Sequence, residues 1–127
     1  MIDRIDHFVL TVRSLERTCA FYEKVLGFRR SDTPGRPTAL VFGTQKINLH
    51  EAGAEFSPHA RAPTPGSGDL CLLSDEPVEE VAARLAAEGI ALEEGPVART
   101  GARAPLRSIY LRDPDGNLIE ISSYLSR

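Results

Sequence analysis

The stretch IDHFVLTVRSLERTCAFYEKVLGF, residues 5–28, decides the fold of this protein. Alternate residues from Phe8 to Val12 are apolar, which is typical of a strand with one buried face. From Leu15 to Leu26 the apolar residues instead recur at helical spacing. Ser14 can cap the start of this helix, and Gly27 stands where a left-handed residue is wanted to end it. The stretch therefore predicts a strand followed directly by an amphipathic helix.

Three short strand candidates follow the helix and complete a βαβββ module. They cover residues 28–33, 37–43 and 46–52, with turn residues such as Pro34-Gly35 between them. Residues 53–68 then hold three prolines and three glycines without apolar periodicity. Such a composition is typical of a loop. We interpret residues 1–52 as a first module and residues 53–68 as a connector.

The remaining chain, residues 69–127, repeats the same order of elements. A strand candidate from Asp69 to Ser74 precedes apolar residues at helical spacing from Val78 to Ala86, with Pro77 in the first turn and Gly89 at the end. The last three strand candidates are Ile90 to Val97, Leu106 to Arg112 and Asn117 to Tyr124. We therefore predict an α+β fold in which two βαβββ modules form one domain, an open, curled mixed sheet shaped as a cup, with the helices outside.

Composition restricts the classes of partner. The chain has 127 residues, 42% of them hydrophobic, and a formal net charge of -3 from interspersed signs. One compact core is expected, and nucleic acid is not, because basic residues do not cluster. Neither a membrane span nor a signal peptide is expected, since Met1 leads directly into a strand. Cys19 and Cys71 stand apart in apolar runs, which favours free thiols and the cytoplasm.

The repeat indicates which polar residues occupy equivalent places. Placing Gly27-Phe28 on Gly89-Ile90 puts His7 on Asp69, and a longer loop near residues 98–105 then puts His50 on Glu120. Strand alternation places all four on the face away from the helices. Two imidazoles and two carboxylates suit a divalent iron, manganese, nickel, cobalt or zinc ion. Taken singly, a strand histidine is more often a surface residue, and Asp69 at a strand start is also an ordinary turn residue.

Several motifs resemble those of a known family. They are residues 6–10 (DHFVL), 20–22 (AFY), 26–28 (LGF) and 113–120 (DPDGNLIE), and together with the paired modules they resemble the vicinal oxygen chelate superfamily. This superfamily includes glyoxalase I, extradiol dioxygenases, thiol transferases that inactivate fosfomycin, and bleomycin-binding proteins. The resemblance implies metal ligands on the first, fourth, fifth and eighth strands. The closing motif is its most specific part.

Carried over to this sequence, the resemblance implies that His7 and Glu120 are metal ligands. At the fourth-strand position His50 stands in place of the usual glutamate, and at the fifth-strand position Asp69 stands in place of histidine. The count of imidazoles and carboxylates is preserved. If Asp69 is too short to reach the metal, the set reduces to His7, His50 and Glu120.

The function implied is chelation of two adjacent oxygens of a small substrate, with stabilisation of an enediolate-type intermediate, as in glyoxalase I. Glu120 is the expected catalytic base, with Asp69 second. One alternative is an extradiol-type ring-cleaving dioxygenase using Fe(II), in which Tyr110 or Tyr124 could replace the usual acid-base histidine. Another is a non-catalytic drug- or metabolite-binding protein. We expect a homodimer, whose cups form within one chain or between swapped halves.

Overall fold

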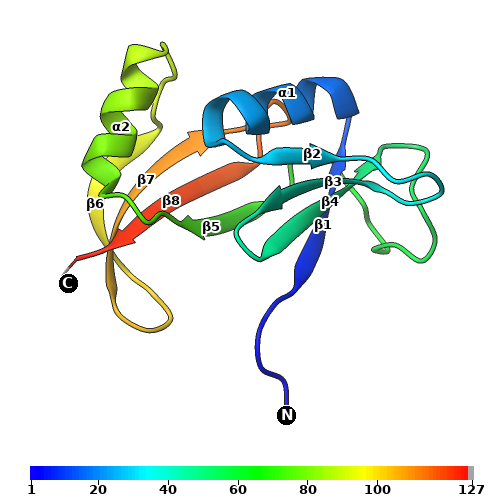
Figure 1. The fold of residues 1–127 in the computed structure, drawn as a ribbon, viewed down its shortest axis with the longest axis horizontal. Coiled ribbons are helices and arrows are strands. Elements are labelled where there is room, and N and C mark those ends of the chain that lie inside the picture. The colour runs from blue at the N-terminus through cyan, green and yellow to red at the C-terminus, as the bar shows by residue number, and fades with distance from the viewer. Residues whose placement is uncertain (126–127) are drawn as a thin grey trace. The chain divides into compact units, whose positions relative to one another are not determined.

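The structure, a computed structural model, describes residues 1–125 and divides into two compact units. Unit 1 comprises Met1–Gly68 together with Asp113–Gly116, and unit 2 comprises Asp69–Arg112 together with the chain from Asn117 onwards. The predicted connector closes unit 1, and the predicted second module begins unit 2. The final two residues of that module lie outside the described residues. Figure 1 shows the order of the elements.

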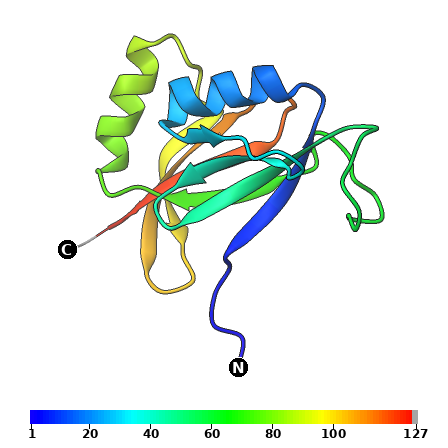
Figure 2. The same ribbon diagram turned by 45° about the vertical axis from the view of Figure 1, so that its right-hand side comes forward.

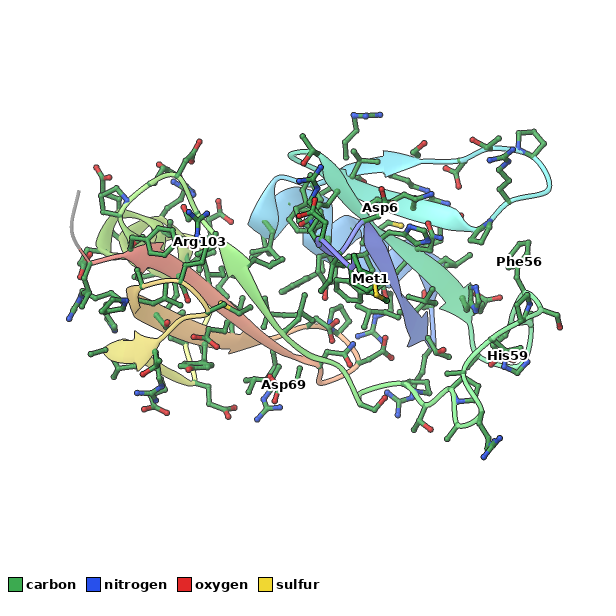
Figure 3. The ribbon with its side chains drawn as sticks, turned by 90° about the horizontal axis from the view of Figure 1, so that it is seen from below. Met1, Asp6, Phe56, His59, Asp69 and Arg103 are labelled. Carbon is green, nitrogen blue, oxygen red and sulfur yellow. The ribbon has the colours of Figure 1, made fainter. Side chains whose placement is uncertain are left out.

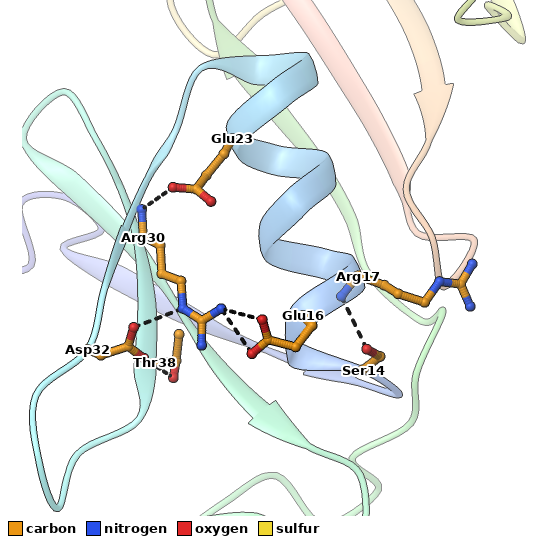
Figure 4. Close-up of polar contacts among 7 residues, drawn as sticks. All are labelled: Ser14, Glu16, Arg17, Glu23, Arg30, Asp32 and Thr38. Atoms are coloured by element: carbon orange, nitrogen blue, oxygen red, sulfur yellow. Dashed lines mark hydrogen bonds and ion pairs between the residues drawn. The ribbon is translucent and has the colours of Figure 1, made fainter.

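Unit 1 is a four-stranded mixed sheet with one helix on one face. Its elements are β1 (His7–Val12), α1 (Leu15–Leu26), β2 (Arg29–Ser31), β3 (Thr38–Phe42) and β4 (Gln45–Glu51). The strands lie in the order β1-β4-β3-β2, with β1 parallel to β4 and the other pairs antiparallel. In Figures 1 and 2, α1 lies over this sheet. The helix begins at Ser14, whose Oγ accepts a hydrogen bond from the Arg17 amide (3.1 Å), and ends at Gly27 with φ 72° (Figure 4).

The core of unit 1 lies between α1 and the sheet. Cys19 and Tyr22 of α1 are almost fully buried, as are the side chains on the helix-facing side of three strands, Leu10, Val12, Leu40, Ile47 and Leu49. Phe28 stacks on Phe42, with ring centroids 4.4 Å apart, and closes one end of this core. Because these residues alternate along β1 and β4, the intervening side chains of the same strands point to the opposite face.

The tip of the β7–β8 hairpin, Asp113–Gly116, belongs to unit 1 and holds α1 in place. The buried Tyr22 hydroxyl donates a hydrogen bond to Oδ2 of Asp113 (2.7 Å). Oδ1 of Asp115 accepts from both the backbone and the guanidinium of Arg13, each at 3.2 Å. Burial, and then the carboxylate of Asp113, raise the pKa of Tyr22 far above its ordinary value. The DPDG motif is therefore a tertiary contact as well as a turn.

A polar cluster around Arg30 joins α1 to the sheet on the solvent side (Figure 4). The Arg30 guanidinium donates to Asp32 (2.8 Å) and to both oxygens of Glu16 (3.1 Å), and the Arg30 amide donates to Glu23 (3.3 Å). A hydrogen bond from Thr38 and then the contact with Arg30 lower the pKa of Asp32. Exposed ion pairs contribute little each, so this cluster orients the helix more than it stabilises the unit.

Unit 2 repeats the arrangement. Its elements are β5 (Asp69–Leu73), α2 (Val78–Ala87), β6 (Glu94–Thr100), β7 (Pro105–Arg112) and β8 (Leu118–Tyr124), in the strand order β5-β8-β7-β6. Strands β5 and β8 are parallel, and α2 packs against β6, β7 and β8. The helix-facing side chains form the core, namely Val78, Val81, Leu85, Ile109, Leu111, Ile119 and Ile121. The predicted α+β fold of two βαβββ modules is thus confirmed.

One strand starts later than predicted. The sequence favoured Ile90 to Val97, whereas β6 spans Glu94–Thr100. The Ile90 amide is used to end α2, where it donates to the Leu85 carbonyl (2.9 Å), and ladder pairing begins only when the Glu93 amide donates to the Tyr110 carbonyl (2.7 Å). The alternation of apolar residues after Gly89 therefore reflects the helix end and not a strand.

Candidate functional site

His7 stands at the start of β1, on the sheet face away from α1. Its Nδ1 makes a 2.8 Å hydrogen bond with Oδ1 of Asp6, and 42% of its side chain is exposed. A carboxylate on one ring nitrogen fixes the orientation of the imidazole and leaves Nε2 as the free nitrogen. Figure 3 shows Asp6 at the entrance to β1. His7 is thus held as metal-ligating histidines commonly are.

Strand β4 presents three polar side chains to the same face, Lys46, Asn48 and His50, and Lys46 lies directly opposite His7. His50 is 4% exposed, and its Nδ1 has no hydrogen-bond partner among residues 1–125. The ring of Phe56, from the connector, lies 5.6 Å from the His50 ring. Oδ1 of Asn48 is likewise buried and without a partner in the described part of the chain. Buried polar atoms normally have partners, so this face has unused hydrogen-bonding capacity.

The strand register corrects the repeat alignment at His50. In unit 1, His7 lies opposite Lys46, and Asn48 lies opposite Val9. In unit 2, Asp69 lies opposite Leu118, and Glu120 lies opposite Cys71. With His7 equivalent to Asp69, the residue equivalent to Glu120 is therefore Asn48. His50 lies two residues further along, at the position of Ser122.

The register also determines which predicted ligands are neighbours. Within unit 1, His50 lies opposite Thr11, four residues along β1 from His7. Four strand residues span about 13 Å, so the structure does not bring these two imidazoles together. Asn48, by contrast, is a diagonal neighbour of His7 on the same face. The half-site of unit 1 is therefore an imidazole beside an amide.

Unit 2 brings Asp69 and Glu120 together in the same diagonal relationship. Asp69 is exposed at the start of β5, and Glu120 is half-buried in the middle of β8. Oε2 of Glu120 accepts a hydrogen bond from Oγ of Ser122 (3.3 Å), and Ser122 also contacts Sγ of Cys71 (3.2 Å). Burial, and more weakly the charge of Glu120, raise the pKa of Cys71. The half-site of unit 2 is a pair of carboxylates beside a protonated thiol.

The donor types fit a divalent metal, although no complete cluster is formed. No group of three or more histidine, cysteine, aspartate or glutamate side chains within residues 1–125 lies close enough to hold an ion. Each unit instead presents one diagonal pair, His7 with Asn48 and Asp69 with Glu120. An imidazole with a free nitrogen, two carboxylates and an amide oxygen are ligands that iron, manganese and zinc accept. The chemistry of these donors is therefore suited to a divalent metal ion.

Two features of this face were not predicted from the sequence. Asn48 was not proposed as a site residue, because the loops of the two halves differ in length and hide the register. The second feature is a contact beside Glu120, where Arg99 donates to the hydroxyl of Tyr110. A strand arginine and a strand tyrosine eleven residues apart carry no sequence pattern that links them.

The chain consists of two βαβββ modules, and each carries polar, metal-competent residues on the sheet face away from its helix. These features define the class of protein, a two-module α+β protein. The chain belongs to the Glyoxalase/Bleomycin resistance protein/Dioxygenase superfamily, whose profile matches residues 4–121. The resemblance noted in the sequence is therefore confirmed. Within residues 1–125, no helix is both long and apolar enough to cross a membrane.

The chain is similar to several known proteins. It is 54% identical to the virulence protein STM3117 of Salmonella typhimurium over 98% of this chain and 87% of that protein, and the crystal structure of STM3117 superimposes with a TM-score of 0.96 over 98% and 99% of the two chains. A catechol-2,3-dioxygenase of Bacillus subtilis is 35% identical over 92% of this chain, which spans 40% of that protein's length. The lactoylglutathione lyase of Agrobacterium tumefaciens is 25% identical, with a TM-score of 0.74 over 97% and 95% of the two chains.

Proposed function

We propose that this protein is a divalent-metal-dependent enzyme that binds two adjacent oxygens of a small substrate. The observation that supports this most strongly is that His7 is oriented by Asp6, with Nε2 left available. Superfamily membership supports it further, since relatives include a lactoylglutathione lyase and a catechol-2,3-dioxygenase.

His7, Asp69 and Glu120 are the ligands in this proposal, with Oδ1 of Asn48 available as a fourth donor or for the substrate. The ion is iron, manganese, nickel, cobalt or zinc. When bound, it supplies positive charge that holds the substrate oxygens and stabilises negative charge as it develops there. We propose a homodimer, with each chain folded as a single domain.

The first candidate reaction is a glyoxalase I-like isomerisation. In it, the carboxylate of Glu120 removes a proton from one carbon and returns it to the neighbouring carbon, with Asp69 as the second candidate base. Glu120 is supported for this role by its position in the middle of β8, where it is half-buried and has no ion pair among the described residues. The substrate is small and carries adjacent oxygens.

The second candidate reaction is extradiol-type ring cleavage with Fe(II), and the position of His50 favours it. This reaction needs an acid or base that does not ligate the metal. His50 lies opposite Thr11, four positions along β1 from His7, and its buried Nδ1 has no hydrogen-bond partner among residues 1–125. Histidine is a side chain that enzymes commonly use for proton transfer. His50 would then move protons rather than bind metal. The 35% identical catechol-2,3-dioxygenase supports this candidate.

The proposal is tested by metal analysis of protein purified without chelator. We expect one metal per site in the wild type and in His50→Gln, and loss of metal in His7→Ala and Glu120→Ala. Equal, sub-stoichiometric metal in all four proteins would refute the metalloenzyme. Loss of metal in His50→Gln would show that His50 is a metal ligand.

Activity assays separate the two reactions. Oxygen uptake with catechols under Fe(II), abolished in His50→Gln while metal is retained, supports ring cleavage. Loss of the methylglyoxal-glutathione adduct, abolished in Glu120→Gln and retained in His50→Gln, supports the isomerase. Tight binding of either substrate without turnover supports a binding protein.

The free thiols of Cys19 and Cys71 fit the reducing cytoplasm, where we place the protein.

A further inference from the structure

Tyr110 lies directly opposite Glu120 in the antiparallel β7–β8 pair, on the same sheet face. Opposite residues in such a pair bring their Cβ atoms within about 5.5 Å, so the two side chains are in reach of each other. On the other side of Glu120 is Cys71, and one row further is Ser122. Tyr110 is thus the aromatic neighbour of the proposed ligand and base.

The contact with Arg99 defines the hydrogen-bonding role of the Tyr110 hydroxyl. Nε of Arg99 donates to it at 2.9 Å, and an arginine can only donate. The phenol oxygen is therefore the acceptor in this contact, which leaves its own O–H for another group. The negative charge of Glu120, together with burial as the larger cause, raises the pKa of Tyr110, whereas the contact with Arg99 lowers it. Because its oxygen accepts from Arg99, the Tyr110 hydroxyl can donate its own O–H toward the Glu120 carboxylate opposite it.

Arg99 is itself fixed on three sides. Its guanidinium donates to Oε2 of Glu94 (2.8 Å) and to the carbonyl of Ala98 (2.9 Å), and it lies 5.4 Å from the centre of the Tyr110 ring. The cation is neutralised by Glu94, so it does not serve as a free anion-binding group. Its geometry instead limits the rotation of the Tyr110 side chain.

Unit 1 lacks this arrangement at the equivalent place. Opposite Asn48, the counterpart of Glu120, β3 carries Ala39, which has no hydroxyl. Of these two equivalent places, the one with the carboxylate has the tyrosine, so the tyrosine is not required by the βαβββ fold. A structural requirement of the repeat would place a similar residue in both units.

We propose that Tyr110, held by Arg99, is a positioning residue that orients the carboxylate of Glu120. Oε2 of Glu120 accepts from Ser122 (3.3 Å), and in this proposal the carboxylate also accepts from the hydroxyl of Tyr110, which lies opposite it, so it cannot rotate freely. This inference rests on the metal-binding role proposed for Glu120. Orientation of a ligating carboxylate by a hydrogen-bond donor raises metal affinity, as outer partners of metal ligands generally do.

The test is a titration of the full chain with Co²⁺, followed by visible absorption. Because removal of an outer partner typically costs 10–100-fold in metal affinity, we expect Tyr110→Phe to weaken Co²⁺ binding by about that factor and to change the absorption spectrum. Arg99→Gln should weaken binding as well. The double variant should bind within about twofold of Tyr110→Phe, because Arg99 acts through Tyr110. Arg107→Gln, which removes an ion pair with Glu79 of α2, is the matched control for Arg99→Gln and should bind as the wild type does.

Two results would overturn the inference. One is Co²⁺ affinity in Tyr110→Phe within twofold of the wild type, and the other is a double variant whose loss equals the product of the single losses. If the wild type binds no Co²⁺, the proposed function fails instead. The positioning role is then decided by the ¹³Cδ resonance of Glu120 in metal-free protein, which must shift alike in Tyr110→Phe and Arg99→Gln. An unchanged resonance refutes the role. Unfolding midpoints confirm that each variant is folded.

Discussion

Replacing Tyr22 by phenylalanine should destabilise unit 1 by about 2 kcal/mol. The ring is fully buried, and its hydroxyl donates to Oδ2 of Asp113 at 2.7 Å, so the variant removes one hydrogen bond to a buried carboxylate while the packing is nearly unchanged. Hydrogen bonds to charged groups contribute about 1.5–3 kcal/mol, and the carboxylate is left without this donor in the variant. The free energy of unfolding should fall accordingly.

Urea unfolding at pH 7 measures the effect, with Tyr124→Phe, at an exposed position, as the matched control with less than about 0.5 kcal/mol lost. In an Asp113→Asn background, Tyr22→Phe should cost less, because the charged acceptor is gone. A loss below 0.5 kcal/mol in Tyr22→Phe, or full additivity with Asp113→Asn, would refute the reasoning.

The same contact predicts a dependence on alkaline pH. Burial and the neighbouring carboxylate raise the pKa of Tyr22 in the folded protein, whereas in the unfolded chain it titrates near 10. The unfolded state therefore loses its proton first. The contribution of Tyr22 to stability is constant below about pH 10 and falls above it by about 1.4 kcal/mol per pH unit. The wild type should show a steeper decline than Tyr22→Phe. Equal slopes in the two proteins would contradict the assignment.

Three further outcomes follow from backbone geometry, packing and the first-strand histidine. Gly95→Ala should cost more than about 2 kcal/mol, since φ is 103° and a Cβ would come within 2.9 Å of a backbone atom of β7. Gly43→Ala has open space around it and should cost about 1 kcal/mol. Urea unfolding midpoints compare the two variants. Leu40→Ala, at a fully buried position, should lower the free energy of unfolding by about 2–5 kcal/mol in the same assay. Asp6→Asn should weaken Co²⁺ binding up to about tenfold by releasing the His7 ring, and unchanged affinity would exclude that role.

The fold was predictable because its local signals agree. The periodicity of residues 8–12 and 15–26, the cap at Ser14 and the left-handed Gly27 all act within a few residues, and the structure confirms each of them. The shift of β6 had a different cause. The amide of Ile90 completes the helix end, which removes it from the ladder. A local pattern cannot distinguish a residue that ends a helix from one that begins a strand.

The types of residue in the candidate site were predictable from the sequence, but the strand register that pairs them was not. Strand alternation predicts metal-competent side chains on one face of β1 and β4 in unit 1, and on one face of β5 and β8 in unit 2, and the alternation is present in each unit. The pairing of Asn48 with Val9, and of Glu120 with Cys71, depends on loop lengths and on a parallel ladder between distant segments. A two-residue error in the second half therefore exchanged Asn48 for His50. The roles of His7, His50, Asp69 and Glu120 stay predictions.

The position of Asp113–Gly116 has a consequence for how the chain is made. These residues belong to unit 1, although the whole helix and three strands of unit 2 precede them in the sequence. During synthesis, the hydroxyl of Tyr22 lacks its acceptor on Asp113 until the DPDG segment has been added about ninety residues later. A fragment ending at Gly68 would lack this hydrogen bond. The first module is therefore completed almost last, so folding of the two halves is coupled by the order of translation.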